Sequence, residues 1–424
     1  MALIINSIFF HKPQTPQKEA LRVSDCLICT SIISKMSEMR EPPILLHRKI
    51  NHIPYDIVLN ILGELPVKSV MRLRCVSKSM YSSITSPDFI STHLNNIINN
   101  NKNGDNAYVI HMSSLPRTNH DNALVCTVAL DRTFDRISEI EIPFNFPTAC
   151  IRFQLVGSCN GLLCLADNST TTYANALYLW NPSIRKFKKL PPSCLGKLNN
   201  DTLGFAYCSD NNDYKVVRTS CSSLRMSTSE IELYTLSSDS WRRVEISSTT
   251  DVIFSRNFLS PIPLINGALH WLAYIKEENC MAETNIVAFD VNSEKFIRKL
   301  ALPDGTTFAH RRRYLTSFRG KLAFIEQSFC QSIWVMRDYG VVESWNKLFV
   351  LPFINEDCWI SLTDYGSLMV CYRNYLVKRL GFKSALIDTE TLQEKKDTDI
   401  QHPSYVATFM ESLVLLDGTN VESY

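Results

Sequence analysis

One short motif has the residue spacing of a catalytic nucleophile. Cys159 stands between Gly157-Ser158 and Asn160-Gly161, which is the spacing of a nucleophile elbow. Such an elbow needs a strand before the nucleophile, a helix after it and a base nearby. Here Gly161 opens another apolar run, Gly161-Leu-Leu-Cys-Leu165, which favours a hairpin between two strands. We therefore expect a turn at Cys159, and a cysteine hydrolase stays as the alternative from another functional class.

Metal and cofactor motifs are missing from the sequence. The nine histidines are dispersed, and no His-Glu-x-x-His string occurs. Cys26-x-x-Cys29 has no second pair and no histidine at zinc-ligand spacing. No glycine-rich loop of the phosphate-binding kind is present. The sequence therefore predicts no metal and no cofactor.

The densest basic cluster outside the N-terminal part is His310-Arg311-Arg312-Arg313. It follows Pro303-Asp304-Gly305 and precedes an apolar run that ends at Phe318, so we expect a loop. Guanidinium groups pair well with phosphate and carboxylate groups. Arg311, Arg312 and Arg313 are therefore candidate target-binding residues for an acidic or phosphorylated segment. A solvated charged loop is the alternative.

The composition is that of a soluble globular protein large enough for two domains. The chain has 424 residues, of which 45% are apolar and 20% charged, and a net charge of +2. A charge so close to zero gives no support for a nucleic-acid partner or an anionic membrane surface. No run of 18 apolar residues occurs, so no membrane span is expected. Fourteen scattered cysteines indicate a reducing compartment, the cytoplasm or the nucleus.

Residues 47–94 read as short helices that dock on another protein. Pro54 suits the first turn of a helix, and Pro66 ends that helix. Ser86-Pro87-Asp88 has the cap, the first-turn proline and the acidic residue of another helix start. So short a segment cannot bury a sizeable core by itself. Apolar residues at helical spacing are thus left for a partner, and in the first helix they are Ile57, Val58, Ile61, Leu62 and Leu65.

This segment resembles an F-box. The resemblance rests on Ile53-Pro54, on the string from Leu65 to Lys78, on Tyr81 and on Pro87-Asp88-Phe89. Ile53 stands where leucine is usual and Met80 where tryptophan is common. The resemblance implies a Skp-type adaptor as partner and, through it, a cullin. The adaptor-binding residues that it implies are Ile53, Pro54, Ile57, Val58, Ile61, Leu62, Leu65, Pro66, Leu73, Val76 and Met80.

The flanking segments differ in character. Residues 1–46 mix proline, serine and charge without periodicity, which predicts a disordered extension. Met36 and Met39 lie just ahead of the helices, so whether residues 1–35 are translated stays open. Residues 95–106 are rich in asparagine and predict a linker whose first part extends the last helix.

Residues 107–424 predict a ring of β-sheets. Turn pairs beside apolar strands recur at Asn160-Gly161, Asn266-Gly267, Arg319-Gly320, Tyr365-Gly366 and Asp417-Gly418. Large residues that start a further strand recur 47 to 55 residues apart, at Phe187, Trp241, Phe296, Trp345 and Leu392. This period predicts kelch-like propeller blades, with those residues packed between sheets. Strands at 108–112 and 412–416 are the candidates for closing the ring in one blade.

The strings Gly157–Cys164, Leu179–Phe187, Gly204–Tyr207, Asn212–Val217 and Leu269–Trp271 resemble the F-box-associated domain of plant F-box/kelch-repeat proteins. The expected fold is thus a small all-α F-box domain followed by an all-β, propeller-like (kelch-type) domain. The resemblance implies a non-catalytic substrate receptor of a Skp–cullin–F-box ubiquitin ligase, with an unknown protein target on the propeller. An adaptor-bound scaffold without ubiquitin transfer is a second alternative, and pollen S-locus F-box proteins share this build.

Overall fold

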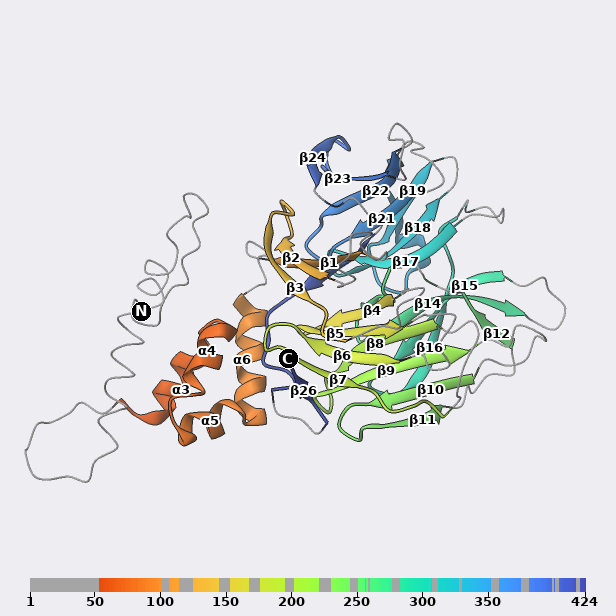
Figure 1. Cartoon of the computed structure of the whole chain (residues 1–424). Coiled ribbons are helices and arrows are strands. Elements are labelled where there is room, and N and C mark those ends of the chain that lie inside the picture. Colours follow the sequence, from red (N-terminus) through yellow and green to blue (C-terminus); the bar gives the residue numbers. More distant parts are fainter. Residues whose placement is uncertain are drawn as a thin grey trace, which may run out of the picture.

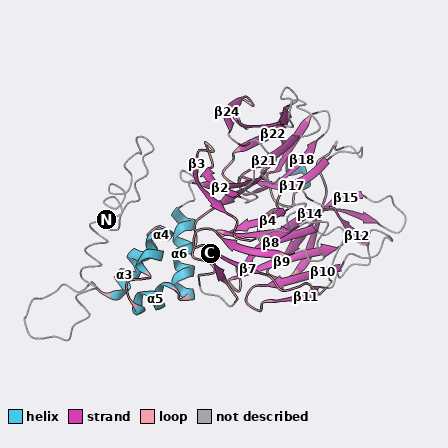
Figure 2. Ribbon diagram, viewed as in Figure 1, coloured by secondary structure: helices cyan, strands magenta, loops and turns pink. Residues whose placement is uncertain are grey.

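The described residues of a computed structural model form four α-helices beside six β-sheets (Figures 1 and 2). The structure describes residues 53–100, 107–113, 125–144, 153–167, 176–194, 202–220, 230–244, 251–255, 257, 260–276, 283–304, 306, 312–327, 330–351, 358–374, 381–398, 400, 404–416 and 420–424. The prediction for residues 1–46, Cys26-x-x-Cys29, Arg311 and the turn Asp417-Gly418 lie outside these ranges.

The helices form one module, and local capping explains where they begin. They are α3 (Tyr55–Gly63), α4 (Val67–Leu73), α5 (Lys78–Ile84) and α6 (Pro87–Asn100). Pro54 caps α3, and Pro66 caps α4 instead of ending α3, which stops at Gly63. Ser77 caps α5 by accepting the Met80 N–H at 3.1 Å, and Ser86 caps α6 as expected. The four short helices share a core that includes Leu62, Val70, Met80 and Ile84.

The first part of the asparagine-rich run is helical. Asn95 to Asn100 belong to α6, so the helix ends six residues beyond the predicted domain edge. Asn96 donates to the Gly63 carbonyl at 3.2 Å, and Asn100 donates to the Glu64 carboxylate at 3.3 Å. The first bond satisfies a backbone carbonyl at the C-terminal end of α3 that lacks a partner inside its own helix, and the second connects α6 to the side chain of the α3 cap.

The strands form a six-bladed propeller, in which each blade is an antiparallel sheet. Blade 1 contains β25 (Ser404–Phe409), β1 (Tyr108–Ser113), β2 (Val125–Leu130) and β3 (Arg136–Glu141). Blade 2 contains β4 (Phe153–Cys159), β5 (Leu162–Asp167), β6 (Leu177–Asn181), β7 (Lys186–Lys189) and β26 (Glu422–Ser423). Blade 3 contains β8 (Thr202–Cys208), β9 (Asp213–Ser220), β10 (Glu230–Thr235) and β11 (Ser240–Val244).

The other three blades follow in sequence order. Blade 4 contains β12 (Asp251–Phe254), β13 (Leu264–Ile265), β14 (Ala268–Lys276), β15 (Glu283–Asp290) and β16 (Lys295–Leu300). Blade 5 contains β17 (Arg312–Phe318), β18 (Lys321–Gln327), β19 (Gln331–Met336), the 3-10 helix η3 (Val342–Ser344) and β20 (Trp345–Leu351). Blade 6 contains β21 (Cys358–Leu362), β22 (Leu368–Asn374), β23 (Gly381–Ile387) and β24 (Glu394–Thr398).

The ring closes in blade 1, but not with the expected segment. β1 pairs with β25, so that Tyr108 lies opposite Phe409, whereas residues 412–416 form no strand. The run from Leu413 to Leu416 is buried throughout. Its apolar character predicted a strand, yet it packs between the helical module and blade 2 instead of joining a sheet.

Turn geometry matches the sequence prediction at three hairpins. Both residues of Asn160-Gly161, Asn266-Gly267 and Arg319-Gly320 have positive φ, the conformation of a two-residue type I′ hairpin turn. Gly161 is required for a further reason, because a Cβ there would lie 2.5 Å from the Met410 carbonyl oxygen. The C-terminal tail therefore passes directly over this turn.

The repeated large residues lie where the blades meet. Trp241 is the second residue of β11, the outermost strand of blade 3, and is buried in the cluster that joins blades 2 and 3. Phe187, Phe296 and Trp345 lie at the same place in their blades. Leu392 differs, because it occupies the left-handed turn position before β24 (φ 56°) that Asp239 holds before β11.

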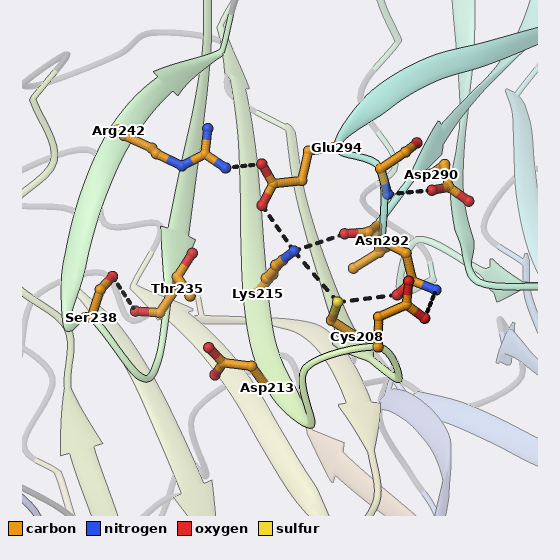
Figure 3. Close-up of polar contacts among 12 residues, drawn as sticks. Cys208, Asp213, Lys215, Thr235, Ser238, Arg242, Asp290, Asn292 and Glu294 are labelled. Carbon is orange, nitrogen blue, oxygen red and sulfur yellow. Dashed lines mark hydrogen bonds and ion pairs between the residues drawn. The ribbon is translucent and has the colours of Figure 1, made fainter.

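Ion pairs also join neighbouring blades. Lys188 of blade 2 lies 2.9 Å from Asp239 of blade 3, and Lys215 of blade 3 lies 2.8 Å from Glu294 of blade 4. Arg242 contacts the other oxygen of Glu294 (Figure 3). In each pair the acidic residue has positive φ in the turn before an outermost strand. Both lysines are almost fully buried, so these pairs constrain how adjacent blades pack.

The buried His270 of β14 makes the propeller sensitive to acid. It is fully buried, its Nε2 lies 2.7 Å from the Tyr339 hydroxyl, and burial lowers its pKa from 6.5 to about 4. As the pH falls from 6.5 to about 4, His270 therefore becomes protonated in the unfolded chain while it stays neutral in the folded chain, so the free energy of unfolding decreases. Burial also lowers the pKa of His93 in α6, and this acts in the same direction.

We expect His270 alone to cost about 2 kcal/mol of unfolding free energy between pH 7.5 and pH 5. Urea unfolding at the two pH values measures this loss, and His270→Gln should flatten it. A His270→Gln protein with the full pH dependence of the parent would assign the effect to other groups.

Candidate functional site

The predicted adaptor-binding residues divide into three groups. Leu62, Leu73 and Met80 are buried inside the helical module, with 0%, 3% and 0% of their surface exposed. The structure therefore corrects the prediction that these three contact a partner directly. Val58, Ile61, Leu65 and Val76 are half-buried, and Ile53, Pro54, Ile57 and Pro66 are exposed.

Four large apolar side chains form what we call the docking patch: Ile53, Tyr55, Ile57 and Tyr81, which are 39% to 54% exposed. The Tyr55 hydroxyl lies 2.9 Å from the Ser83 hydroxyl and 3.2 Å from that of Ser79, which fixes the start of α3 against α5. The Arg74 guanidinium lies over the Tyr81 ring, 5.3 Å from its centroid. Sequence reasoning missed Tyr55 and assigned no role to Tyr81, since helical spacing alone cannot say which apolar face stays uncovered.

Exposed apolar residues on the propeller have a different origin. Ile137, Ile297 and Leu348 are bulge residues in the outermost strands of blades 1, 4 and 5, where the register shifts by one. A bulge turns its extra residue outward and disrupts an unpaired sheet edge, which protects it from pairing with other chains. These residues are spread over three blades, whereas the residues of the docking patch all belong to the small helical module, at the start of α3 and in α5.

The two faces of the propeller differ in their connections. The helical module joins the face where β1 begins and β25 ends. The longest connection between strands of one blade on that face is 337–344, whereas the opposite face carries connections such as 114–124, 142–152, 190–201 and 301–311. Long connections on a rigid scaffold are the usual carriers of binding residues.

The arginine cluster begins at this opposite face, but not as a free loop. Arg312 and Arg313 are the first residues of β17, which corrects the prediction of a loop. Arg312 is exposed, while Arg313 is directly opposite Glu326 and donates to its carboxylate at 2.9 Å and 3.1 Å. Arg313 is therefore engaged inside its sheet. Arg311 lies outside the described residues, so among the described residues of this cluster Arg312 is the one whose side chain is exposed to solvent.

A cavity of about 250 Å³ lies at the end of the central channel, on the face of the helical module. Every blade contributes to its wall, through Thr408, Cys159, Phe205, Ser260, Thr316 and Asp364. Cys159 ends β4 in a hairpin and no helix follows it. Burial raises the pKa of its thiol to about 12, and no histidine lines the cavity. The geometry therefore disfavours a cysteine nucleophile here.

A second cysteine lies among charged groups between blades 3 and 4 (Figure 3). The Cys208 sulfur is 3.0 Å from the Asn292 side-chain oxygen and 3.5 Å from the Lys215 nitrogen. Lys215 also donates to the Val291 carbonyl and pairs with Glu294. Cys208 is 1% exposed, so a substrate cannot reach this cluster, and we interpret it as part of the contact between blades.

Within the described ranges, no three His, Cys, Asp or Glu side chains gather closely enough to hold a metal ion. The described helices also include none with the length and apolarity that a membrane crossing requires.

Comparison with known proteins identifies both regions. A family model for the F-box domain matches residues 50–92, and one for the F-box associated beta propeller domain matches residues 117–416. "F-box protein CPR1" of Arabidopsis thaliana is 29% identical over 325 residues, which are 70% of this chain and 73% of that protein. "F-box/kelch-repeat protein At3g23880" of the same plant is 26% identical over 332 residues, which are 73% of this chain and 83% of that protein.

Proposed function

The chain belongs to the family of F-box proteins with an F-box associated beta propeller domain, and from this premise we propose that it is the substrate receptor of a Skp–cullin–F-box ubiquitin ligase. The F-box would bind a Skp-type adaptor, and the propeller would bind a target protein. A separate conjugating enzyme would perform the chemistry. The chain itself would act by raising the effective concentration of the target near that enzyme.

The docking patch is the observation that carries this proposal. Ile53 lies just before α3, Tyr55 and Ile57 lie in α3, and Tyr81 lies in α5. All four are exposed, although buried apolar residues fill the core of the module. An uncovered cluster of isoleucine and tyrosine is typical of a protein interface. The test is purification of the tagged full-length chain from plant extract. A Skp-type adaptor and a cullin should co-purify, and their absence would contradict the proposal.

Two alternatives predict different results. A scaffold that binds the adaptor without ubiquitin transfer would leave the half-life of its target unchanged when the F-box is inactivated. An enzyme would show turnover that depends on a propeller residue, and the raised pKa of Cys159 argues against that residue. We also propose that the protein is located in the cytoplasm or the nucleus, where it would bind a Skp-type adaptor.

We propose that the target binds the propeller face opposite the F-box. Among the described residues, the F-box packs on the face of short turns, and the longer connections start and end at the opposite face. Arg312 lies at the edge of this opposite face, exposed at the start of β17. It would bind a carboxylate or phosphate group of the target.

Arg312→Ala should weaken target capture by roughly 3- to 10-fold, because an exposed charge pair contributes little more than about 1 kcal/mol. Quantitative mass spectrometry of proteins captured with the ligase blocked measures this loss. Lys295→Ala removes an exposed charge at the opposite face and is the control. Equal capture by both variants and by the parent would remove Arg312 from the target-binding surface.

A further inference from the structure

The C-terminal tail lies between the F-box and blade 2. After β25 the chain crosses the Asn160-Gly161 turn and continues alongside α6 (Figure 1). Leu413, Val414, Leu415 and Leu416 are each at most 8% exposed. Four consecutive buried side chains point in different directions, so the tail must be covered on more than one side. One continuous apolar cluster indeed contains these residues, Val67, Val70 and Leu94 of the F-box, and Leu179 and Ile184 of blade 2.

A buried asparagine holds the backbone of this tail. Asn181 has no exposed surface, and its side-chain nitrogen donates to the carbonyl oxygens of Ser412 at 3.0 Å and Val414 at 2.8 Å. The Ser412 hydroxyl lies 3.2 Å from the same nitrogen. The amide donors of Asn181 are thus directed at the tail, while its oxygen accepts the Ser183 N–H at 2.9 Å within its own turn.

In the corresponding turns of two other blades, an aspartate accepts hydrogen bonds within the turn, as the Asn181 oxygen does in blade 2. Asp290 in blade 4 accepts the Ser293 N–H at 2.6 Å, and Asp388 in blade 6 accepts the N–H groups of Glu390 and Thr391. An acceptor oxygen is therefore enough to form the turn. The Asn181 amide can both accept within the turn and donate to two tail carbonyls, whereas an ionised carboxylate can only accept. Blade 2 has asparagine at this place, and blade 2 is the blade that the tail crosses.

Further contacts extend the attachment along blade 2. Lys186 donates to the Leu416 carbonyl at 2.6 Å, and β26 adds to the outer edge of β7. Trp180, the neighbour of Asn181, donates from its indole nitrogen to the Tyr424 hydroxyl at 3.0 Å. On the F-box side, Lys68 of α4 lies near Glu411, and it partly offsets the rise in the pKa of Glu411 that burial causes.

We propose that the tail is a joint that fixes the F-box to the propeller as one rigid body, and that Asn181 is its anchor. Without the tail, the F-box would lose the apolar contacts of Leu413 to Leu416 that lie between it and blade 2. With the tail, a target on the propeller is held at a constant orientation to the adaptor. This functional consequence rests on the proposed receptor role, whereas the joint itself does not.

Asn181→Asp tests the joint with the replacement of a single heavy atom, the amide nitrogen by an oxygen. The aspartate can still form the turn, as Asp290 and Asp388 do, but it places a carboxylate against the tail carbonyls. In hydrogen–deuterium exchange of the full chain, we expect peptides covering residues 410–424 and α6 to exchange at least roughly 10-fold faster. Calorimetry should resolve two unfolding transitions in place of one. Asp290→Asn, the reciprocal change in blade 4, should alter neither measurement.

Unchanged exchange of the tail and α6 in a folded Asn181→Asp protein would overturn the proposal. If circular dichroism shows that this variant does not fold, Leu413→Ala in the tail is measured in the same way, with the same two outcomes. Adaptor binding is measured in parallel on the unmodified chain. If the unmodified chain does not bind the adaptor, the receptor role is wrong and the joint is unaffected. If it binds the adaptor and Asn181→Asp leaves the exchange unchanged, only the joint is wrong.

Discussion

Replacing Ile57 with aspartate is expected to abolish retention of a Skp-type adaptor while leaving the chain folded. Ile57 is 48% exposed in α3 and belongs to the docking patch, so the folded chain alone loses little when it is changed. In a complex, the carboxylate would have to leave water and enter an apolar interface without a partner. We expect affinity to fall by at least about 100-fold, which corresponds to roughly 3 kcal/mol and is typical of a central interface residue.

The measurement is adaptor binding to the purified chain, with circular dichroism to verify the fold. Ile137→Asp is the matched control, since Ile137 is 52% exposed but lies on the bulge of blade 1. Leu65 is a less informative position, because it is half-buried and its carbonyl accepts a hydrogen bond from His93 at 2.9 Å. Full adaptor affinity in the Ile57→Asp protein would place the interface on another face of the F-box.

The sequence predicted the architecture because its signals are local and repeated. Hairpin turns at Asn160-Gly161 and Asn266-Gly267 require left-handed backbone, which asparagine and glycine adopt readily. Large residues near strand starts, such as Phe187 and Trp241, recur with the blade period. Each of these signals depends on neighbouring residues alone, so the blades could be found without knowing how they pack.

Features that depend on distant contacts could not be predicted in this way. The apolar run Leu413–Leu416 looks like a strand, and only the packing of the F-box against blade 2 explains its burial outside any sheet. Asn96 looks like linker composition until its bond to the Gly63 carbonyl is known. Arg313 looks like a recognition residue until Glu326 is seen opposite it across the hairpin.

The candidate site shows the same division. Spacing found the apolar faces of the helices, but it could not separate Leu62 and Met80, which form the core, from Ile53 and Ile57, which remain exposed. All four are apolar and recur at helical intervals. The difference is made by the packing of α6 on α3 and on α5, for which a single sequence carries no direct signal.

Trp241→Ala is expected to cost about 3–5 kcal/mol of unfolding free energy, the usual result of removing a buried tryptophan. Trp241 is 8% exposed in the cluster shared by blades 2 and 3, and its ring lies 5.4 Å from that of Tyr234. Its indole nitrogen donates to the Pro191 carbonyl at 2.9 Å, which links the end of blade 2 to the edge of blade 3. The substitution therefore leaves both a cavity and an unpaired carbonyl at a junction between blades.

Urea unfolding of the full chain measures this cost, and Trp241→Phe separates its two parts. Phenylalanine keeps most of the apolar volume but loses the hydrogen bond, so we expect a smaller loss, of about 1–2 kcal/mol. Because each blade is held by its two neighbours in a closed ring, weakening one junction should lower the stability of the whole propeller in a single transition. An unfolding midpoint equal to that of the parent in Trp241→Ala would mean that this junction contributes little and that the ring is stabilised elsewhere.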